Sequence, residues 1–352
     1  MPAPTHVFDP PFNIIRCSHA VLDVTDLDKS AAFYEKTVGL HIEDRDDKSV
    51  YLRASEEHQH HSVVLRKAAK AACNRLGFKV GNDGDLDKAA AFCSENGISY
   101  AFVEQPFQGR TLQFTDPFGF QIELYATMEK RPHLLRRYDL YKGCHPQRLD
   151  HFNVFAAEVQ DTVDFYARLG FRLTEYAEED GDNGRIAAAW MHRKGNVHDF
   201  AITNGRGPRL HHIAYWVPTA MNIVHLCDVM ASSGFLKNIE RGPGRHGVAV
   251  TIEVDQAGRL GHRLDLVEAV EGAGKRRQKR PLRLEDLPDR PVTLFRMAIA
   301  ARAALALGLQ PAVELLQGLE AQARLEDVVP GIAHLVLDLA LLPARGRRAS
   351  HR

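Results

Sequence analysis

The sequence predicts an α+β protein of two tandem domains, each an open, barrel-like sheet made of two βαβββ modules, followed by a helical or disordered tail. Three observations predict this class: an internal repeat that relates the two halves, helix patterns that end at glycines, and a change of composition after about residue 271. A chain of 352 residues is long enough to bury the cores of two such domains.

The stronger part of the repeat joins the segments that begin at Cys17 and at Leu149. CSHAVLDVTDLDKSAAFYEKTVGLHIEDRDD can be laid over LDHFNVFAAEVQDTVDFYARLGFRLTEYAEED. Each reads as a strand that carries a histidine, an amphipathic helix that contains Phe-Tyr, a glycine that ends the helix, and a second strand. His19 therefore aligns with His151.

A weaker pair follows each copy. NRLGFKVGNDGDLDKAAAFCSENGI, from Asn74, matches HHIAYWVPTAMNIVHLCDVMASSGF, from His211, again as a strand, a helix and a glycine. His212 then aligns with Arg75. Each half holds two modules of this kind, and the chain holds four.

Both halves close on two strands around a turn, TLQFTDPFGFQIELY in the first and GVAVTIEV, DQAGRLG and HRLDLVEAV in the second. Asp265 aligns here with Glu123. The second half alone thus offers two histidines and a carboxylate, His151, His212 and Asp265, at matched places on three strands. Such a set can form a facial triad, which holds Fe(II) or Mn(II) and leaves positions open for substrate and O2.

The balance of charges excludes several partners. Lys and Arg together number 45, as do Asp and Glu, so no global field attracts nucleic acid or an anionic membrane. No stretch approaches the ~18 apolar residues of a membrane span, and the first residues do not read as a secretory signal. Five scattered cysteines without CxxC spacing are typical of reduced thiols, so we expect a cytoplasmic protein.

The predicted domains cover residues 1–143, 144–271 and 272–352. The last begins with a basic, proline-punctuated linker, GKRRQKRPLRLEDLPDRP. Beyond Val292 the chain is rich in Ala, Leu and Arg, and two short stretches there have amphipathic patterns. We expect an accessory or poorly ordered tail.

Several short sequence motifs resemble those of one enzyme family. They are RYDLY (137–141), LDHFN (149–153), AAWMHRKGNVHD (188–199), GPRLHHIAY (207–215) and IERGPGRHGV (239–248). In this order they are similar to the type I extradiol catechol dioxygenases of the vicinal oxygen chelate superfamily, and most to the branch that acts on 3,4-dihydroxyphenylacetate. The resemblance covers about residues 14–248. It implies two domains of that fold, a non-catalytic first domain, a catalytic second domain and a homo-oligomer.

The resemblance also implies a metal centre. His151 and His212 would bind Fe(II), with Mn(II) as the other option. His198 would be the acid–base residue that accepts the proton of the catechol, a role that suits an imidazole. His246 would hydrogen-bond the substrate oxygen or steady a lid over the site.

Three further residues would shape the substrate pocket by the same resemblance. Asn153 and Trp190 would line the O2 side. Arg241 would pair with a carboxylate on the side chain of the substrate, because its planar guanidinium donates two parallel hydrogen bonds. A surface charge in a glycine-rich turn is the competing interpretation of Arg241.

The sequence departs from the family after GRHGV, where it reads AVTIEVDQAGRLGHRLDLV. Asp255 stands where the family has a tyrosine, and Asp265 stands where it has the glutamate ligand. Aspartate is one methylene shorter, so its oxygen falls ~1.3 Å short on an unchanged strand. A metal site tolerates about 0.2 Å, so the strand must move or the affinity falls. Glu268 is a second candidate, and the family's second substrate arginine has no counterpart.

The leading hypothesis is an extradiol dioxygenase that inserts both atoms of O2 into a catechol, such as 3,4-dihydroxyphenylacetate, and yields a muconic semialdehyde in aromatic catabolism. One alternative is a catalytically impaired binding protein with weak metal affinity, which Asp255 and the tail favour. Another is a glyoxalase-like metalloenzyme, against which His198 and the GPGRHG turn argue.

Other histidines receive no role in this interpretation. In the strand RLHHIAYW, strict alternation puts His212 on the face of Ala214 and turns His211 away from the site. We therefore interpret three of them as structural or solvent-exposed, namely His192, His211 and His225. We expect three others to lie at a module edge, namely His58, His60 and His61.

Overall fold

The computed structural model describes residues 3–179, 184–245, 251–257 and 263–269. For residues 240–241, 244–245, 251–257 and 263–269 it describes the backbone alone. The tail after Val292, with its two predicted helices, lies outside the described residues. Among the described helices, none is long and apolar enough to cross a membrane.

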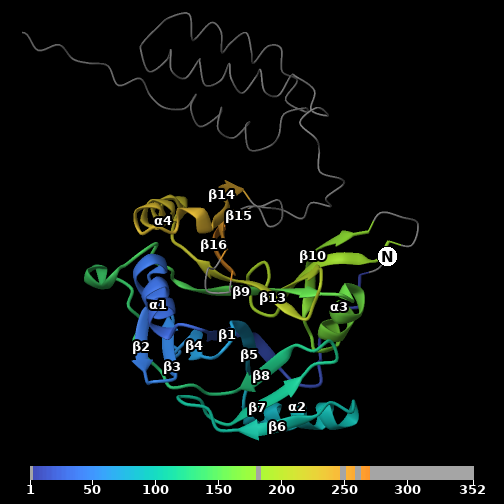
Figure 1. Ribbon diagram of the computed structural model, residues 1–352. Helices are drawn as coiled ribbons and strands as arrows, with labels where there is room; N and C mark the ends of the chain where they lie inside the picture. The colour runs from blue at the N-terminus through green and yellow to red at the C-terminus, as the bar shows by residue number, and fades with distance from the viewer. Residues whose placement is uncertain (1–2, 180–183, 246–250, 258–262, 270–352) are drawn as a thin grey trace, which may run out of the picture. The chain divides into compact units, whose positions relative to one another are not determined.

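The first domain contains two βαβββ modules, as predicted (Figure 1). The first module consists of β1 (Ile14–Val24), α1 (Leu27–Ala32), η1 (Phe33–Val38), β2 (His41–Arg45), β3 (Ser49–Arg53) and β4 (Val63–Lys67). The second consists of β5 (Ala72–Val80), α2 (Asp83–Glu95), β6 (Tyr100–Val103), β7 (Thr111–Thr115) and β8 (Gln121–Tyr125).

The second domain repeats this order after the short helix η2 (Tyr138–Leu140). Its first module consists of β9 (Arg148–Ala156), α3 (Val159–Arg168), β10 (Arg172–Glu178), β11 (Ile186–His192) and β12 (Phe200–Asn204). Its second consists of β13 (Arg209–Trp216), α4 (Ala220–Ser232), η3 (Leu236–Asn238), β14 (Ile239–Arg245), β15 (Thr251–Ala257) and β16 (Arg263–Ala269).

Each domain forms one eight-stranded sheet with the same order of strands. The orders are β2-β3-β4-β1-β5-β8-β7-β6 and β10-β11-β12-β9-β13-β16-β15-β14. In both sheets the first strands of the two modules pair antiparallel at the centre, and each pairs in parallel with the last strand of its own module. The repeat read from the sequence is therefore a repeat of topology.

The two copies of the first helix differ by one residue, and the structure absorbs the difference in a π-helical turn. The chain has one more residue between Tyr34 and Gly39 than between Tyr166 and Gly170. In the first copy α1 continues as the π-helix η1, and the amide of Gly39 donates to the carbonyl of Tyr34. Both glycines have positive φ, 99° and 83°, which glycine adopts without strain. A π-turn is a common way to fit one added residue into a helix.

The two domains share one hydrophobic core. The Phe78 ring, in β5 of the first domain, makes edge contacts with the rings of Phe152, Phe171 and Phe200 in the second, at centroid distances of 5.8, 5.8 and 5.9 Å. Aromatic pairs in this geometry contribute beyond the area that they bury. The second sheet, which carries the candidate site, is thus held against the first by packed rings.

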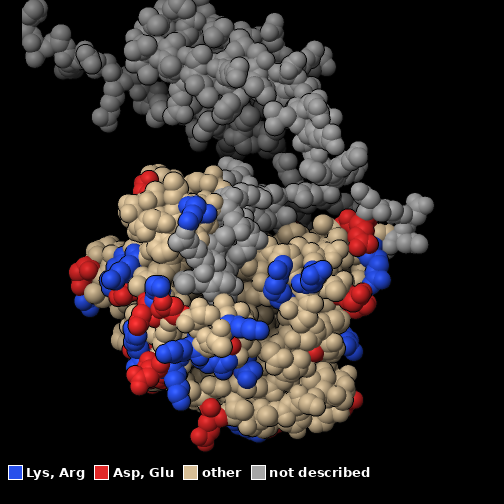
Figure 2. Space-filling model, in the orientation of Figure 1, with Lys and Arg blue, Asp and Glu red and all other residues tan. Residues whose placement is uncertain are grey.

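The distribution of surface charge and the state of the cysteines are those expected from the composition. Figure 2 shows acidic and basic side chains scattered over the same face of the described residues, as balanced charge predicts. All five cysteines are free.

The run around His60 lies in the loop between β3 and β4, and two of its members are buried there. His60 and His61 are buried, at 0% and 2% exposure, whereas His58 is exposed. The His60 ring stacks on Phe107 at 3.7 Å, and His61 packs against Tyr51. The sequence could not show this burial, because Phe107 comes from a distant loop.

Candidate metal centre

Three neighbouring strands bring the predicted ligands of the second domain together. Ala214 in β13 lies opposite His151 of β9 on one side and opposite Asp265 of β16 on the other. Residues opposite one another in a sheet point to the same face. The described side chains include no complete set of three metal-binding groups, and Asp265 is described by its backbone alone.

The first domain has the same register with different residues. Gly77 in β5 lies opposite His19 of β1 and opposite Glu123 of β8. The alignment of the two halves made from the sequence is therefore confirmed at these strands, and Glu123 marks the position that Asp265 takes in the second domain.

The imidazoles of His151 and His212 converge on one point. Both residues are 5% exposed, and their Nε2 atoms lie 3.2 Å apart. Two nitrogens that bind one metal ion at about 2.1 Å and at a right angle are ~3.0 Å apart. The spacing therefore fits two adjacent ligands of one ion.

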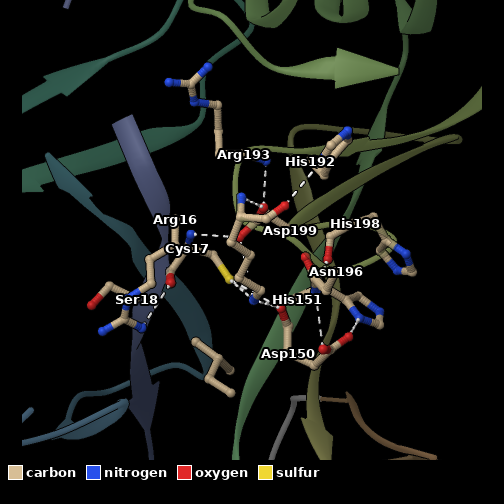
Figure 3. A network of polar contacts seen from close by, with 12 residues as sticks. Arg16, Cys17, Ser18, Asp150, His151, His192, Arg193, Asn196, His198 and Asp199 are labelled. Atoms are coloured by element: carbon tan, nitrogen blue, oxygen red, sulfur yellow. Dashed lines mark hydrogen bonds and ion pairs between the residues drawn. The ribbon is translucent and has the colours of Figure 1, made fainter. Parts of the chain in front are cut away.

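The hydrogen bond at the far side of His151 also fits a metal ligand. Its Nδ1–H donates to Asp150 Oδ2 at 2.8 Å, which leaves a lone pair on Nε2 (Figure 3). Burial raises the pKa of the Asp150 carboxyl, but the hydrogen bond from His151 and the charge of Lys194 hold that pKa below its usual range. The carboxylate thus stays ionised and keeps the tautomer of His151 in which Nε2 can bind a metal.

His212 has a partner that strand alternation did not predict. Its Nδ1 lies 2.6 Å from Nδ1 of His211, whose ring also packs on Phe155 at 4.5 Å. The prediction that His211 faces away is wrong, because β13 has a bulge between Leu210 and His212. A bulge adds one residue to a strand and redirects its side chain.

His198 lies beside the converging imidazoles. It is 7% exposed, and its ring centroid lies 4.0 Å from that of His151. Burial lowers the pKa of His198 well below its ordinary value. Its Nδ1 is buried and has no hydrogen-bond partner among the described residues. The imidazole is therefore neutral in the protein without substrate.

Asn153 and Trp190 belong to one row across the sheet with His212. Trp190 lies opposite Ala201, Ala201 opposite Asn153, and Asn153 opposite His212. Asn153 is 8% exposed and accepts a hydrogen bond from Thr203 Oγ1 at 3.1 Å. The row brings both predicted pocket residues to the face of the sheet that carries His212.

The remaining predicted residues lie where the structure describes little. His246 lies outside the described residues. Arg241 is described by its backbone, which pairs with Asp255 between β14 and β15. Asp255 in turn pairs with Asp265.

Comparison with known proteins identifies the family. The model of the Glyoxalase/Bleomycin resistance protein/Dioxygenase superfamily matches residues 16–124 and 148–260, one match in each domain. The chain belongs to this superfamily. It is 28% identical over 255 residues to a metapyrocatechase of Geobacillus stearothermophilus, covering 68% of this chain and 76% of that protein. It is 29% identical over 272 residues to a manganese-dependent 2,3-dihydroxybiphenyl 1,2-dioxygenase of Geobacillus genomosp. 3, covering 72% and 84%.

Solved structures of the superfamily are more similar still. The homoprotocatechuate 2,3-dioxygenase of Brevibacterium fuscum, in an anaerobic complex with 3,4-dihydroxyphenylacetate, is 39% identical with a TM-score of 0.71, covering 75% of this chain and 83% of that one. The native enzyme of Arthrobacter globiformis is 37% identical with a TM-score of 0.71, covering 74% and 82%. The resemblance read from the sequence is confirmed.

Two residues that contact the candidate ligands were missed by the superfamily resemblance, namely Asp150 and His211. Each stands immediately before a ligand histidine. Strict strand alternation assigns neighbours to opposite faces, so only the position of the bulges could have revealed them.

Proposed function

We propose that this chain is a non-heme extradiol dioxygenase that opens the ring of a catechol beside its two hydroxyls and inserts both atoms of O2. The observation that carries the proposal is the 3.2 Å separation of His151 Nε2 and His212 Nε2, on strands whose neighbour β16 carries Asp265 in register. Asp265 would complete a facial triad around Fe(II), or around Mn(II). Bound there, the metal would supply Lewis acidity towards two vicinal oxygens and an open position for O2.

The residues around the metal would each have a separate part. His198 would take the proton of a catechol hydroxyl as the ring binds, because burial keeps its imidazole neutral and its Nδ1 lacks a partner among the described residues. His246 would hydrogen-bond a substrate oxygen. Asn153 and Trp190 would line the side where O2 approaches and keep bulk water from it.

The substrate would be a catechol with an acidic side chain. Arg241 lies in β14, which pairs with β15, and β15 pairs with β16, so its backbone is two strands from Asp265. A guanidinium there can bind a carboxylate with two hydrogen bonds. The similar enzyme of Brevibacterium fuscum was solved with 3,4-dihydroxyphenylacetate, which has this chemistry.

The proposal assigns no metal to the first domain. His19 Nε2 is bonded directly to Glu123 Oε1 at 2.9 Å, and Glu123 also accepts from Gln108 and Gln113. Arg75, at the place of His212, brings its Nε to 3.9 Å from the same carboxylate. A guanidinium and three hydrogen bonds thus already satisfy the carboxylate. Residues 1–143 would be the non-catalytic domain and residues 144–271 the catalytic one.

The test is anaerobic loading of the full chain with Fe(II), followed by 3,4-dihydroxyphenylacetate and air. We expect one iron per chain and a yellow muconic semialdehyde. His151→Ala is expected to lose both, whereas His19→Ala is expected to retain both. One iron per chain without colour from any catechol contradicts the dioxygenase proposal.

A binding protein with a weakened metal site is the second candidate, and the aspartate at position 265 favours it. Failure of the wild-type chain to retain iron, together with binding of 3,4-dihydroxyphenylacetate in calorimetry, would establish that function instead. The proposal places the enzyme in the cytoplasm, where the free cysteines stay reduced, and as a homo-oligomer. Light scattering of the full chain tests the latter.

A further inference from the structure

Both strands that carry the candidate histidines have a bulge, and the bulged residue in each case directly precedes a histidine. In β9 the register passes from Leu149 to His151, so Asp150 is the added residue. In β13 it passes from Leu210 to His212, so His211 is the added residue. Bulges are frequent beside active sites because they redirect a side chain that alternation would turn away.

Each redirected side chain reaches the Nδ1 atom of the following histidine. Asp150 Oδ2 lies 2.8 Å from His151 Nδ1, and His211 Nδ1 lies 2.6 Å from His212 Nδ1. With His211 Nδ1 as the acceptor from His212, the two ligand histidines His151 and His212 both carry their hydrogen on Nδ1. Both Nε2 lone pairs then face the point between the two rings. We propose that Asp150 and His211 are positioning residues that set the tautomer and ring orientation of the two metal ligands.

Further contacts fix Asp150. Asn196 Nδ2 donates to Asp150 Oδ1 at 3.1 Å and to the carbonyl of His198 at 2.6 Å (Figure 3). The Nζ atom of Lys194 donates to the backbone carbonyl of Asp150. Because one amide holds both Asp150 and His198, the orientation of His151 is tied to the segment that carries the acid–base residue.

Phe155 supports the ring of His211. The imidazole packs on the Phe155 ring at a tilt of 60°, and the guanidinium of Arg209 lies over the same phenyl ring at 4.5 Å. These contacts oppose a rotation of the His211 ring away from His212. A positioning residue needs such support, since a partner that rotates freely fixes no tautomer.

The first domain provides an internal comparison. Its central strands have the same two bulges, with Ser18 in the place of Asp150 and Asn74 in the place of His211. Ser18 bonds Tyr125 and Gln59, and Asn74 bonds Asp23, so neither contacts the domain's own histidine. The Nδ1 of that histidine, His19, has no partner among the described residues.

The bulges therefore occur in both domains, whereas the Nδ1 partners occur only where we propose a metal. The backbone geometry alone does not require Asp150 or His211, because Ser18 and Asn74 occupy the same bulges. This difference separates a role in metal binding from a role in folding. The inference rests on the proposed site at His151 and His212.

The experiment measures Fe(II) affinity of the apo full chain by anaerobic competition with a chromophoric chelator. The variants are Asp150→Ser, which installs the residue of the first domain, and His211→Phe, which keeps a ring beside Phe155 and removes Nδ1. We expect each to raise the Kd for Fe(II) by about 10–100-fold, the usual effect of losing such a partner. His211→Asp, whose carboxylate can accept from His212 Nδ1 as that of Asp150 accepts from His151 Nδ1, is expected to restore most of the affinity.

The matched control is Asp116→Asn. Asp116 is as buried as Asp150, at 3% against 8% exposure, and binds Tyr166 Oη rather than a histidine. It is expected to lower stability and leave the Kd for Fe(II) unchanged. Folded Asp150→Ser and His211→Phe proteins with wild-type Kd values overturn the inference, and Asp150→Leu, which is close to aspartate in volume and cannot accept a hydrogen bond, replaces the serine variant if that one does not fold. A wild-type chain that binds no Fe(II) overturns the metal site itself and this inference with it.

Discussion

The imidazole of His19 lies directly over Gly77, the residue opposite it in the neighbouring strand. A Cβ at position 77 would overlap this ring, whereas Ala214 stands at the matching position of the second domain. The missing side chain lets His19 reach Glu123 across β5, while His151 has a methyl group at that place and converges on His212 instead. The methyl group of Ala214 thus distinguishes the second domain, where His151 and His212 converge, from the first, where His19 is bonded to Glu123.

Gly77→Ala is expected to push His19 away from Glu123. The Glu123 carboxylate keeps its hydrogen bonds from Gln108 and Gln113 but loses its buried partner His19. We therefore expect the free energy of unfolding, measured in urea, to fall by about 3 kcal/mol. Gly195→Ala is the control, because no atom lies within 4 Å of its added Cβ. Equal stability of the two variants would contradict the close packing of His19 on Gly77.

Asp265→Glu is expected to strengthen the metal site. The longer side chain reaches about 1.3 Å further from the same backbone position, the one that Glu123 takes in the first domain. We expect at least tenfold tighter Fe(II) binding and faster ring cleavage, while Asp265→Ala loses the metal. Weaker binding by Asp265→Glu would mean that β16 has moved inwards to suit the shorter residue.

The repeat and the register of the ligand strands could be predicted from the sequence because they depend on spacing. His19 and His151 stand at the same distance before a Phe-Tyr pair in an amphipathic helix, and this order carries over to the fold. The alignments of His212 with Arg75 and of Asp265 with Glu123 follow from the same periodicity.

The partners of the ligands could not be predicted in this way. A bulge leaves no mark in the amino-acid sequence of a strand. Strict alternation therefore assigns Asp150 and His211 to the face of the sheet opposite the ligand histidines. The burial of His60 depends on Phe107, which a loop brings back from far along the chain. Contacts of this kind arise from tertiary packing, which local patterns do not encode.

His198→Asn is expected to lower turnover while iron stays bound. The imidazole touches the ring of His151 but lies outside the pair of converging Nε2 atoms, so its loss removes a proton acceptor and not a ligand. We expect kcat for 3,4-dihydroxyphenylacetate to fall about 10²–10⁴-fold, as for other general bases. His192→Asn, at a half-buried residue of β11, is the control and should keep both iron and turnover. Loss of iron in the His198 variant would instead make this residue a ligand.

His41 makes the stability of the first domain sensitive to mild acid. Burial, with the charge of Arg53, lowers the pKa of His41 to about 4 from an ordinary value of 6.5, and its Nε2 is buried without a partner among the described residues. Between these two pKa values the unfolded chain binds more protons than the folded chain, so stability falls as the pH drops from 6.5 to 4.

His41→Gln is expected to remove this part of the pH dependence. Because the side chain is partly exposed, we expect the loss of unfolding free energy between pH 7 and pH 5 to shrink by about 1 kcal/mol relative to the wild type. Urea titrations at the two pH values measure it. His225→Gln, at an exposed position of α4, is the matched control and should leave the difference as it is in the wild type. An unchanged difference in His41→Gln would show that His41 takes up its proton without cost, and that its burial does not resist the charge.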